Sequence, residues 1–345
     1  MSQSPSEILR PAAEDPELSA AASCQGKAGG EVGNIVPLLF STNALFLQHA
    51  TVCLTSLLVN NPDLFFDVVI VSNPAEHLDS DKVRRSLGSF SNYSLRFQEF
   101  IPPVEVLPPL DAGAHYTLDT WTRFWVAEFF PADVNRMLYL DADMVVVGSI
   151  RSLWQTNLDG ALLAAVDIPG SQIGVNALAI PSEAGYFNAG VMLIDLKQWR
   201  SSRALDTLLD FVRAYPDRLA SVDQDVLNAC FYNRRKRLDY KWNVIRPFFR
   251  DDTWWLPLTQ GELEEVRRQA VIIHYNGGLK PWSYFSDHPR RDEYHKYLRM
   301  TEWRDFVPAD RTAVNIVRKR VSAILPSPVK ALLKTIGTQL SWPPG

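Results

Sequence analysis

Two aspartates, Asp141 and Asp143, follow directly on the apolar run at residues 137–140. Side chains two apart on an extended segment point to the same face, so both carboxylates can grip one cation. Like charges at the end of a buried strand are costly unless a cation neutralises them. The pair therefore indicates a metal site at the carboxyl edge of a sheet, where α/β proteins bind ligands. The alternative is a polar strand end that faces water.

His274 offers a third ligand for the same cation. It follows the apolar residues 271–273, which predict a last buried strand. One imidazole with two carboxylates suits a borderline ion such as Mn²⁺ better than Ca²⁺, with Mg²⁺ as the alternative. Gly277 and Lys280 come next, and a glycine turn followed by a lysine is typical of a loop that binds phosphate. A structural histidine in the core is the competing interpretation.

Five motifs follow one another along the chain. They are residues 139–143 (YLDAD), 186–191 (YFNAGV), 223–228 (DQDVLN), 240–243 (YKWN) and 274–282 (HYNGGLKPW). Together and in this order they resemble the retaining glycosyltransferases of family 8, which include lipopolysaccharide galactosyltransferases and glycogenin. The resemblance covers roughly residues 35–297.

This resemblance implies a single GT-A, Rossmann-like α/β domain with a mixed central sheet. By the family pattern, Asp141, Asp143 and His274 bind manganese, and Lys280 contacts the diphosphate of a UDP-sugar. The residues expected to contact the donor are Asn43, Phe46, Arg123, Asp141, Ala142, Asp143, Asp167, Asn188, Ala189, Gly190, Gly277 and Lys280. Arg123 also fits an ordinary exposed helix arginine, and Gly190 also fits a tight turn into a buried strand.

Asp223, Gln224 and Asp225 are the candidates for the reacting centre. Retention at the anomeric carbon needs either a carboxylate nucleophile or departure and attack on one face of a short-lived cation. Gln224 matches the family residue nearest the anomeric carbon, and an amide is too weak a nucleophile for a lasting covalent intermediate. We therefore expect same-face transfer, with Gln224 and Asp225 stabilising positive charge and orienting sugar hydroxyls. Asp223 is also expected to cap a helix.

The first strand departs from the family pattern. Family members usually continue it with an aspartate that accepts a hydrogen bond from the uracil ring, whereas this chain has Asn43 at that place. An amide oxygen can still accept from a ring N–H. Family members usually have a tyrosine shortly after this aspartate, and Phe46 can supply an aromatic face in its place. Recognition of uridine is therefore expected from the resemblance alone.

Apolar runs alternate with helical patterns along the part of the chain that must position these residues. Strands are expected at residues 35–40, 65–71, 93–97, 161–166, 191–194 and 271–273, and helices at about 50–58, 82–87 and 196–212. Such alternation implies parallel strands with helices on both faces of the sheet.

The composition suits one large domain with appendages, because 46% of the 345 residues are apolar. A formal charge of −4 predicts no attraction to nucleic acid, and three scattered cysteines favour a reducing compartment. We expect a disordered segment at residues 1–34, the glycosyltransferase domain at 35–305 and a basic amphipathic tail at 306–345. The chain has no signal-peptide pattern and no apolar run of about 20 residues, so a cytoplasmic location is expected.

The tail carries basic residues interleaved with apolar ones, and no acidic residue follows Asp310. This pattern is typical of a peripheral anchor that contacts the anionic inner face of a membrane. An ordinary surface helix that packs its apolar stripe on the core is the alternative.

The sequence thus predicts transfer of galactose or glucose from a UDP-sugar to a hydroxyl of a carbohydrate or lipid-linked acceptor. Two rival functions stay open at this point. A metal-dependent nucleotidyltransferase would also use paired carboxylates, but it would need no shelf for a sugar at Asn188. A degenerate member that binds sugar nucleotides without turnover is the second rival.

Overall fold

The computed structural model describes residues 34–108, 118–171, 175, 178–250 and 255–324. The disorder expected for residues 1–34 lies almost wholly outside these ranges, and so does the tail beyond residue 324. None of the helices in the described ranges is long and apolar enough to span a membrane.

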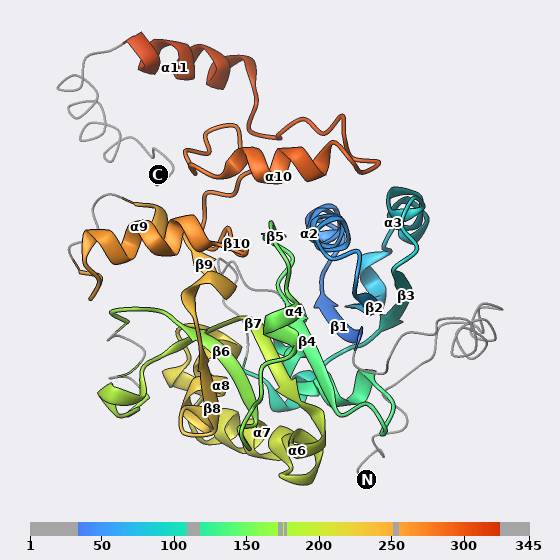
Figure 1. Cartoon of the computed structure of the whole chain (residues 1–345), viewed down its shortest axis with the longest axis vertical. Helices are drawn as coiled ribbons and strands as arrows, with labels where there is room; N and C mark the ends of the chain where they lie inside the picture. The colour runs from blue at the N-terminus through green and yellow to red at the C-terminus, as the bar shows by residue number, and fades with distance from the viewer. Residues whose placement is uncertain (1–33, 109–117, 172–174, 176–177, 251–254, 325–345) are drawn as a thin grey trace.

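A seven-stranded mixed sheet runs through the domain in the order β3-β2-β1-β4-β7-β6-β8 (Figure 1). β7 is antiparallel to both of its neighbours, and the other neighbouring pairs are parallel. The strands are β1 Ile35–Ser41, β2 Phe65–Ser72, β3 Tyr93–Glu99, β4 Arg136–Leu140, β6 Leu163–Asp167, β7 Phe187–Asp195 and β8 Arg235–Leu238. The mixed α/β fold expected from the sequence is confirmed.

A second, three-stranded sheet lies beside the first, in the order β5-β10-β9. Its strands are β5 Met144–Val146, β10 Ile272–His274 and β9 Val244–Ile245. The chain passes from β4 in the large sheet to β5 in the small sheet through residues 141–143 alone. The acidic pair therefore lies at the junction of the two sheets.

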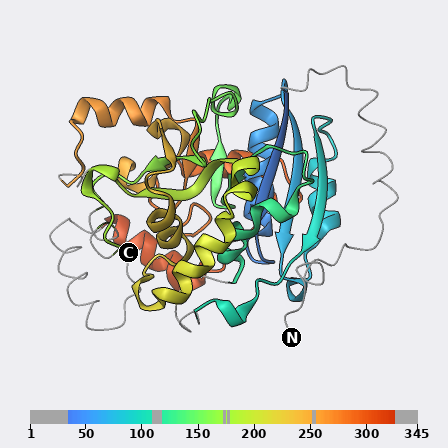
Figure 2. The ribbon, with the colours of Figure 1, turned by 90° about the horizontal axis from the view of Figure 1, so that it is seen from below.

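Apolar side chains cover the large sheet on both faces. One cluster joins the strands to α2 and α3, and another joins them to η5, α6, α7 and α8. In Figure 2, seen from below, the yellow helices of this second layer come to the front. The helices that border the sheet are α2 Leu47–Asn60, α3 Ser80–Leu87, η5 Leu118–Phe129, α6 Leu196–Ser201, α7 Ala204–Ala214 and α8 Val222–Phe231.

The remaining helical segments are short or lie near the small sheet. They are η3 Pro74–Glu76, η4 Val104–Val106, α4 Arg151–Trp154, η6 Ser182–Ala184, η7 Pro216–Arg218, η8 Tyr240–Trp242, η9 Arg246–Phe249, α9 Gln260–Gln269, α10 Arg291–Leu298 and α11 Ala313–Ile324. In Figure 1 the orange and red helices α9, α10 and α11 gather at the end of the molecule that holds the small sheet.

The single helix expected at residues 196–212 is wrong, because the structure divides it into α6 and α7. Arg203 between them has a φ of 53°, in the left-handed region that ends a helix. The apolar spacing continues across the break, so periodicity alone could not reveal it.

Candidate active site

The register of the small sheet brings His274 to the acidic pair. β10 runs antiparallel to β5 with His274 opposite Met144, the residue directly after Asp143. One ligand atom from each of Asp141, Asp143 and His274 lies within 4.8 Å of the other two. The structure thus joins His274 to two neighbouring aspartates that lie more than 130 residues before it in the sequence.

Each carboxylate uses one oxygen for a protein partner and turns the other toward the imidazole. Asp141 Oδ1 accepts hydrogen bonds from the Tyr139 hydroxyl and Arg123 Nη2, both at 3.0 Å. Asp143 Oδ2 accepts from Lys280 Nζ at 2.5 Å. The other oxygens, Asp141 Oδ2 and Asp143 Oδ1, lie 3.8 and 3.2 Å from His274 Nε2. Two oxygens and one nitrogen converging in this way are a suitable ligand set for a divalent cation.

Gly190 leaves the space that this ligand set needs. A Cβ at this position would lie 2.6 Å from His274 Cε1 and 2.7 Å from Asp141 Oδ2. The backbone of Gly190 also accepts a hydrogen bond from the Asp141 amide at 2.9 Å, because β4 and β7 are antiparallel neighbours. A close approach of backbone to the ligands, and not only a turn, therefore accounts for this glycine.

Burial and nearby charges shift the pKa values of two carboxyl groups of the site in opposite directions. Burial opposes ionisation of Asp143, but the Lys280 ammonium holds the pKa of this carboxyl well below its usual range. Burial raises the pKa of Asp223 to about 7, against the pull of Arg123, whose Nε lies 2.8 Å from Asp223 Oδ2. Arg123 is therefore a buried ion-pair partner and not an exposed helix arginine, since only 9% of it is accessible.

A hydrogen-bonded group of neutral side chains adjoins the carboxylates. Asn188 Oδ1 accepts from the Gly190 amide, and Asn188 Nδ2 donates to Gln224 Oε1 at 3.1 Å. Gln224 Oε1 also accepts from the Ala189 amide at 3.0 Å, and its Nε2 donates to the Tyr186 hydroxyl. The expected sugar shelf of residues 188–190 is thus joined directly to Gln224.

Asp225 is engaged within the protein. Its Oδ1 accepts from the Tyr186 hydroxyl at 2.5 Å, and its Oδ2 accepts from the Ser221 amide at 2.6 Å. Only 2% of the residue is exposed. These contacts fix the orientation of Tyr186, which in turn holds the Gln224 amide.

The expectation that Asp223 caps its helix is wrong. Ser221 takes the N-cap position of α8, and Asp223 is the second residue inside the helix, paired with Arg123. Between them, Val222 has a φ of 48°, a left-handed conformation that is rare and strained for a β-branched residue. Strain of this kind persists where surrounding contacts hold the backbone, as they do here beside Gln224.

The loop after His274 is held from two sides. Lys280 Nζ donates to Asp143 and to the Tyr275 carbonyl, the latter at 2.9 Å. Gly277 has a φ of 88°, and a Cβ on it would meet nothing within 4 Å. Its conformation, and not a crowded neighbour, therefore requires glycine, and the side of the loop at Gly277 is open.

The expected base-recognition residues lie beside this loop. Asn43 Oδ1 accepts a hydrogen bond from the Phe46 amide at 3.0 Å and so closes the turn after β1. The Phe46 ring meets the Trp282 ring edge-to-face at a centroid distance of 5.8 Å. Trp282 in turn stacks on His49, with centroids 3.4 Å apart. One lone pair of the Asn43 oxygen is thus used internally.

Asp167 ends β6 at the same edge of the sheet, with its backbone opposite Phe187. Its carboxylate pairs with Arg235 and Arg237. It therefore contacts basic side chains of β8 and is not one of the three candidate metal ligands.

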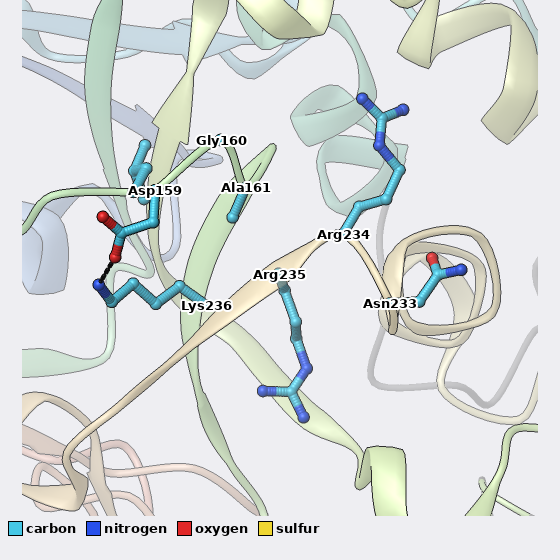
Figure 3. A pocket seen from close by; sticks show the side chains of 8 residues that line it. Asp159, Gly160, Ala161, Asn233, Arg234, Arg235 and Lys236 are labelled. Atoms are coloured by element: carbon cyan, nitrogen blue, oxygen red, sulfur yellow. Dashed lines mark hydrogen bonds and ion pairs between the residues drawn. The ribbon is translucent and has the colours of Figure 1, made fainter.

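An open pocket of about 390 Å³ lies elsewhere, at the amino ends of β6 and β8 (Figure 3). It is lined by Leu158, Asp159, Gly160, Ala161, Asn233, Arg234, Arg235 and Lys236. Lys236 forms an ion pair with Asp159 at its wall. Because β6 carries this pocket at one end and Asp167 at the other, the pocket faces the opposite edge of the sheet from the candidate site.

Three residues of the cluster had no role assigned from the sequence, namely Tyr139, Tyr186 and Asn243. Tyr139 is on β4 and lies two residues before Asp141, which directly follows the strand, and this spacing places both side chains on one face. Tyr186 and Asn243 belong to two of the five motifs, but their partners are 31 or more residues away in sequence, as with Asn243 and His274 or Tyr186 and Asp225. Only the folded chain reveals those pairs.

Residues 37–286 match the family model described as glycosyl transferase family 8. The chain belongs to this family. As a family 8 member it is a glycosyltransferase, which uses a sugar-nucleotide donor and a carbohydrate acceptor. Glycosyl transfer is thereby favoured over the rival nucleotidyl transfer.

Characterised relatives of this family 8 chain span most of its length. It is 26% identical over 293 residues to lipopolysaccharide 1,2-glucosyltransferase of Escherichia coli K12, covering 83% of this chain and 84% of the relative. It is 29% identical over 255 residues to lipopolysaccharide 1,3-galactosyltransferase of Salmonella typhimurium LT2, covering 71% and 72%. The galactosyltransferase LgtC, solved with donor and acceptor sugar analogs, has a similar fold, with a TM-score of 0.67 and 23% identity over 80% of this chain and 98% of LgtC. The GT-A fold expected from the sequence is thus confirmed.

Proposed function

We propose that this enzyme transfers galactose or glucose from a UDP-sugar to a hydroxyl of a carbohydrate or lipid-linked acceptor, with retention at the anomeric carbon. The observation that carries the proposal is the convergence of Asp141, Asp143 and His274 beside the backbone of residues 188–190. The two lipopolysaccharide relatives, one a glucosyltransferase and one a galactosyltransferase, support a hexose donor and a lipopolysaccharide-like acceptor.

Asp141 Oδ2, Asp143 Oδ1 and His274 Nε2 would hold the cation, Mn²⁺ or Mg²⁺. When bound, such an ion neutralises charge that develops on a diphosphate as its sugar leaves. Lys280, one hydrogen bond from Asp143, adds a positive charge at the same place. Arg123 holds the second carboxylate oxygen of Asp141, so that Oδ2 stays directed at the ligand set.

The neutral side chains would orient the sugar. Gln224 Oε1 already accepts two hydrogen bonds, so the group that Gln224 offers to the sugar is the remaining N–H of Nε2. A donor of this kind orients a hydroxyl or a departing oxygen, which supports the second of the two roles expected from the sequence, the orientation of sugar hydroxyls, over the stabilisation of positive charge. Asp225 would act through Tyr186 and would not touch the sugar.

Same-face displacement fits this arrangement better than a covalent intermediate. The side chain that accepts a hydrogen bond from the Ala189 amide is that of Gln224, and a carboxamide is a poor nucleophile. One structure described for LgtC carries an active-site glutamine-to-glutamate change, which supports a glutamine near the reaction in this fold. Uridine recognition would use the second lone pair of Asn43 Oδ1.

A donor screen tests the proposal. Purified protein is incubated with Mn²⁺ and a panel of sugar nucleotides without acceptor, and released nucleotide and sugar are measured by mass spectrometry. Slow Mn²⁺-dependent release of UDP from UDP-galactose or UDP-glucose is expected, and a chelator should stop it. Tight donor binding with no release from any donor would identify a degenerate binding protein instead.

The tail would bring the enzyme to its acceptor at the inner face of a membrane. Within the described part of α11, Val314, Val317 and Val321 are 66%, 59% and 49% exposed, so this apolar stripe does not pack on the core. Removing residues 313–345 is expected to abolish sedimentation with anionic vesicles. A triple serine variant of the three valines, which keeps every charge, should weaken it. Equal vesicle binding by the wild type, the truncated protein and the triple serine variant would contradict this part of the proposal.

A further inference from the structure

Asn243 is completely buried and lies directly before β9, whose Ile245 is paired with His274 of β10. Its amide touches both halves of the site. Oδ1 lies 3.0 Å from His274 Nδ1, and Nδ2 lies 2.8 Å from Asn188 Oδ1. No catalytic or ligand role follows for it from the motif in which it lies.

The direction of these hydrogen bonds follows from backbone donors. The Gly190 amide N–H can only donate, so the Asn188 atom that it reaches at 3.0 Å is the carbonyl oxygen. Asn243 must then turn its NH₂ group toward that oxygen, which leaves its own carbonyl oxygen facing His274. A carbonyl oxygen only accepts, so His274 carries a proton on Nδ1.

The consequence lies on the other side of the ring. A neutral imidazole protonated on Nδ1 has its lone pair on Nε2. That lone pair points at Asp143 Oδ1 and Asp141 Oδ2, at 3.2 and 3.8 Å. Three acceptors that face one another repel unless a cation lies between them.

The side-chain amide of Asn243 is also connected, through Asn188, to Gln224 in the half of the site expected to hold the sugar. With its oxygen held by Gly190 and Asn243, Asn188 must direct its NH₂ group to Gln224 Oε1. The Ala189 amide donates to that same oxygen, so two independent donors agree on the orientation of Gln224. One buried amide therefore links the nitrogen of His274 that is free to the end of Gln224 that is free.

We propose that Asn243 is a positioning residue that fixes the Nδ1-protonated form of His274 and, through Asn188, supports the orientation of the Gln224 amide together with the backbone amides of Ala189 and Gly190. It thereby couples the metal ligands to the sugar shelf. This inference rests on the proposed function for its catalytic meaning, but the state of the His274 ring is a property of the protein itself. Partners that orient a ligating histidine typically change metal affinity by about 10- to 100-fold when removed.

Two substitutions separate the two contacts. Asn243→Ala removes both, whereas Asn243→Asp keeps an acceptor for His274 Nδ1 and loses the donor to Asn188. Asn61 supplies matched controls, because it is also fully buried and its side-chain hydrogen bonds lie away from the site. Its Oδ1 accepts from the Ile150 amide, and its Nδ2 donates to the Leu57 carbonyl. Asn61→Ala and Asn61→Asp report the cost of the same changes to folding alone, measured by thermal melts.

The first readout is the protonation of His274 in the metal-free, full-length protein, observed by ¹⁵N NMR of the imidazole. The second is the binding of Mn²⁺ alone, followed by the EPR signal of the free ion. The wild type and Asn243→Asp are expected to show the Nδ1-protonated ring, and Asn243→Ala a mixture of forms with Mn²⁺ binding weaker by about 10- to 100-fold. Asn243→Asp should retain Mn²⁺ binding but lose UDP-sugar turnover, and both Asn61 variants should bind Mn²⁺ like the wild type.

The failures are distinguishable. A His274 ring in the same form in Asn243→Ala and the wild type, with equal Mn²⁺ binding, would overturn the role of Asn243 and leave the proposed function standing. A ring that changes form in Asn243→Ala, in a protein whose wild type binds no divalent cation, would support the positioning role and overturn the proposed function. If the Asn61 variants lost Mn²⁺ binding to the same extent as Asn243→Ala, the loss would be explained by reduced stability of the fold. That result would overturn the inference.

Discussion

The two halves of the site are built from different chemistry. One half consists of the ionisable groups Asp141, Asp143, His274 and Lys280. The other consists of the neutral groups Asn188, Gln224, Asn243 and Tyr186. Charges act over distance and suit a cation and a diphosphate, whereas fixed amides suit the hydroxyls of a sugar. The charged half therefore needs a bound counter-ion to be complete, whereas the side chains of the neutral half hold one another by hydrogen bonds without one.

Removing one carboxylate from the charged half should have the largest effect. Asp143→Ala is expected to reduce Mn²⁺-dependent UDP release to background while the protein stays folded, because the change opens the ligand set and also relieves like-charge repulsion. Donor turnover and a thermal melt measure the two effects. Asp159→Ala in the distant pocket, where the carboxylate pairs with Lys236, is the control and should retain activity. Undiminished turnover in Asp143→Ala would defeat the metal assignment.

Gly190 tests both halves together, since its backbone contacts Asn188 and its missing side chain leaves room for Asp141 and His274. Gly190→Ala should displace these groups, abolish Mn²⁺ binding and cost about 1–3 kcal/mol of stability through overpacking. Gly261 in α9, where a Cβ meets nothing within 4 Å, is the matched control. Normal Mn²⁺ affinity in Gly190→Ala would show that the ligand set tolerates the added methyl group and that its geometry is not as described.

The neutral half is tested alone by Gln224→Glu. A carboxylate can still accept from Asn188 and Ala189, but it cannot donate to Tyr186 or to a sugar. Loss of one donor at a reacting centre typically lowers kcat by about 10²- to 10³-fold, and Mn²⁺ binding should be unchanged. Gln260→Glu at the exposed start of α9 controls for the added charge. If Gln224→Glu lost Mn²⁺ binding and kcat together, the division of the site into two halves would be wrong.

The prediction with the smallest effect on activity concerns pH and His49, a ring that stacks on Trp282 beside the charged half. Burial lowers the pKa of His49 to about 3; Asp143 raises it and Lys280 lowers it further. The unfolded chain binds the proton near pH 6.5, so the stabilisation is complete above that pH and is lost as pH falls from about 6.5 toward 3. The loss is at most about 1.4 kcal/mol per pH unit for this group.

Denaturant unfolding of the wild type and of His49→Phe across pH 4–7 measures this contribution. The variant should show a shallower dependence than the wild type. The residual slope in the variant would include His288, whose pKa burial lowers to about 4. Parallel curves for the two proteins would show that His49 does not titrate with folding.

The sequence predicts the strands that position the site, because their apolar runs are buried and short: β1, β2 and β3 begin at the expected residues. The sequence also predicts that Asp141, Asp143 and His274 come together, as they do in the structure. Local patterns do not contain the antiparallel placement of β7, the backbone turn at Arg203 or the pairing of Asp223 with Arg123. The strand placement and the ion pair depend on contacts between segments far apart in the chain, and the turn at Arg203 leaves the apolar spacing unbroken. The role of Asn243 is the clearest case, since His274 is 31 residues away from it.

The most direct test of the metal assignment is a crystal structure of the protein with Mn²⁺ and UDP, recorded with anomalous data for manganese. We expect one anomalous peak bounded by Asp141 Oδ2, Asp143 Oδ1 and His274 Nε2, with diphosphate oxygens completing its coordination and Lys280 close by. Bound UDP with the manganese peak outside these three side chains, or with no peak, would contradict the account.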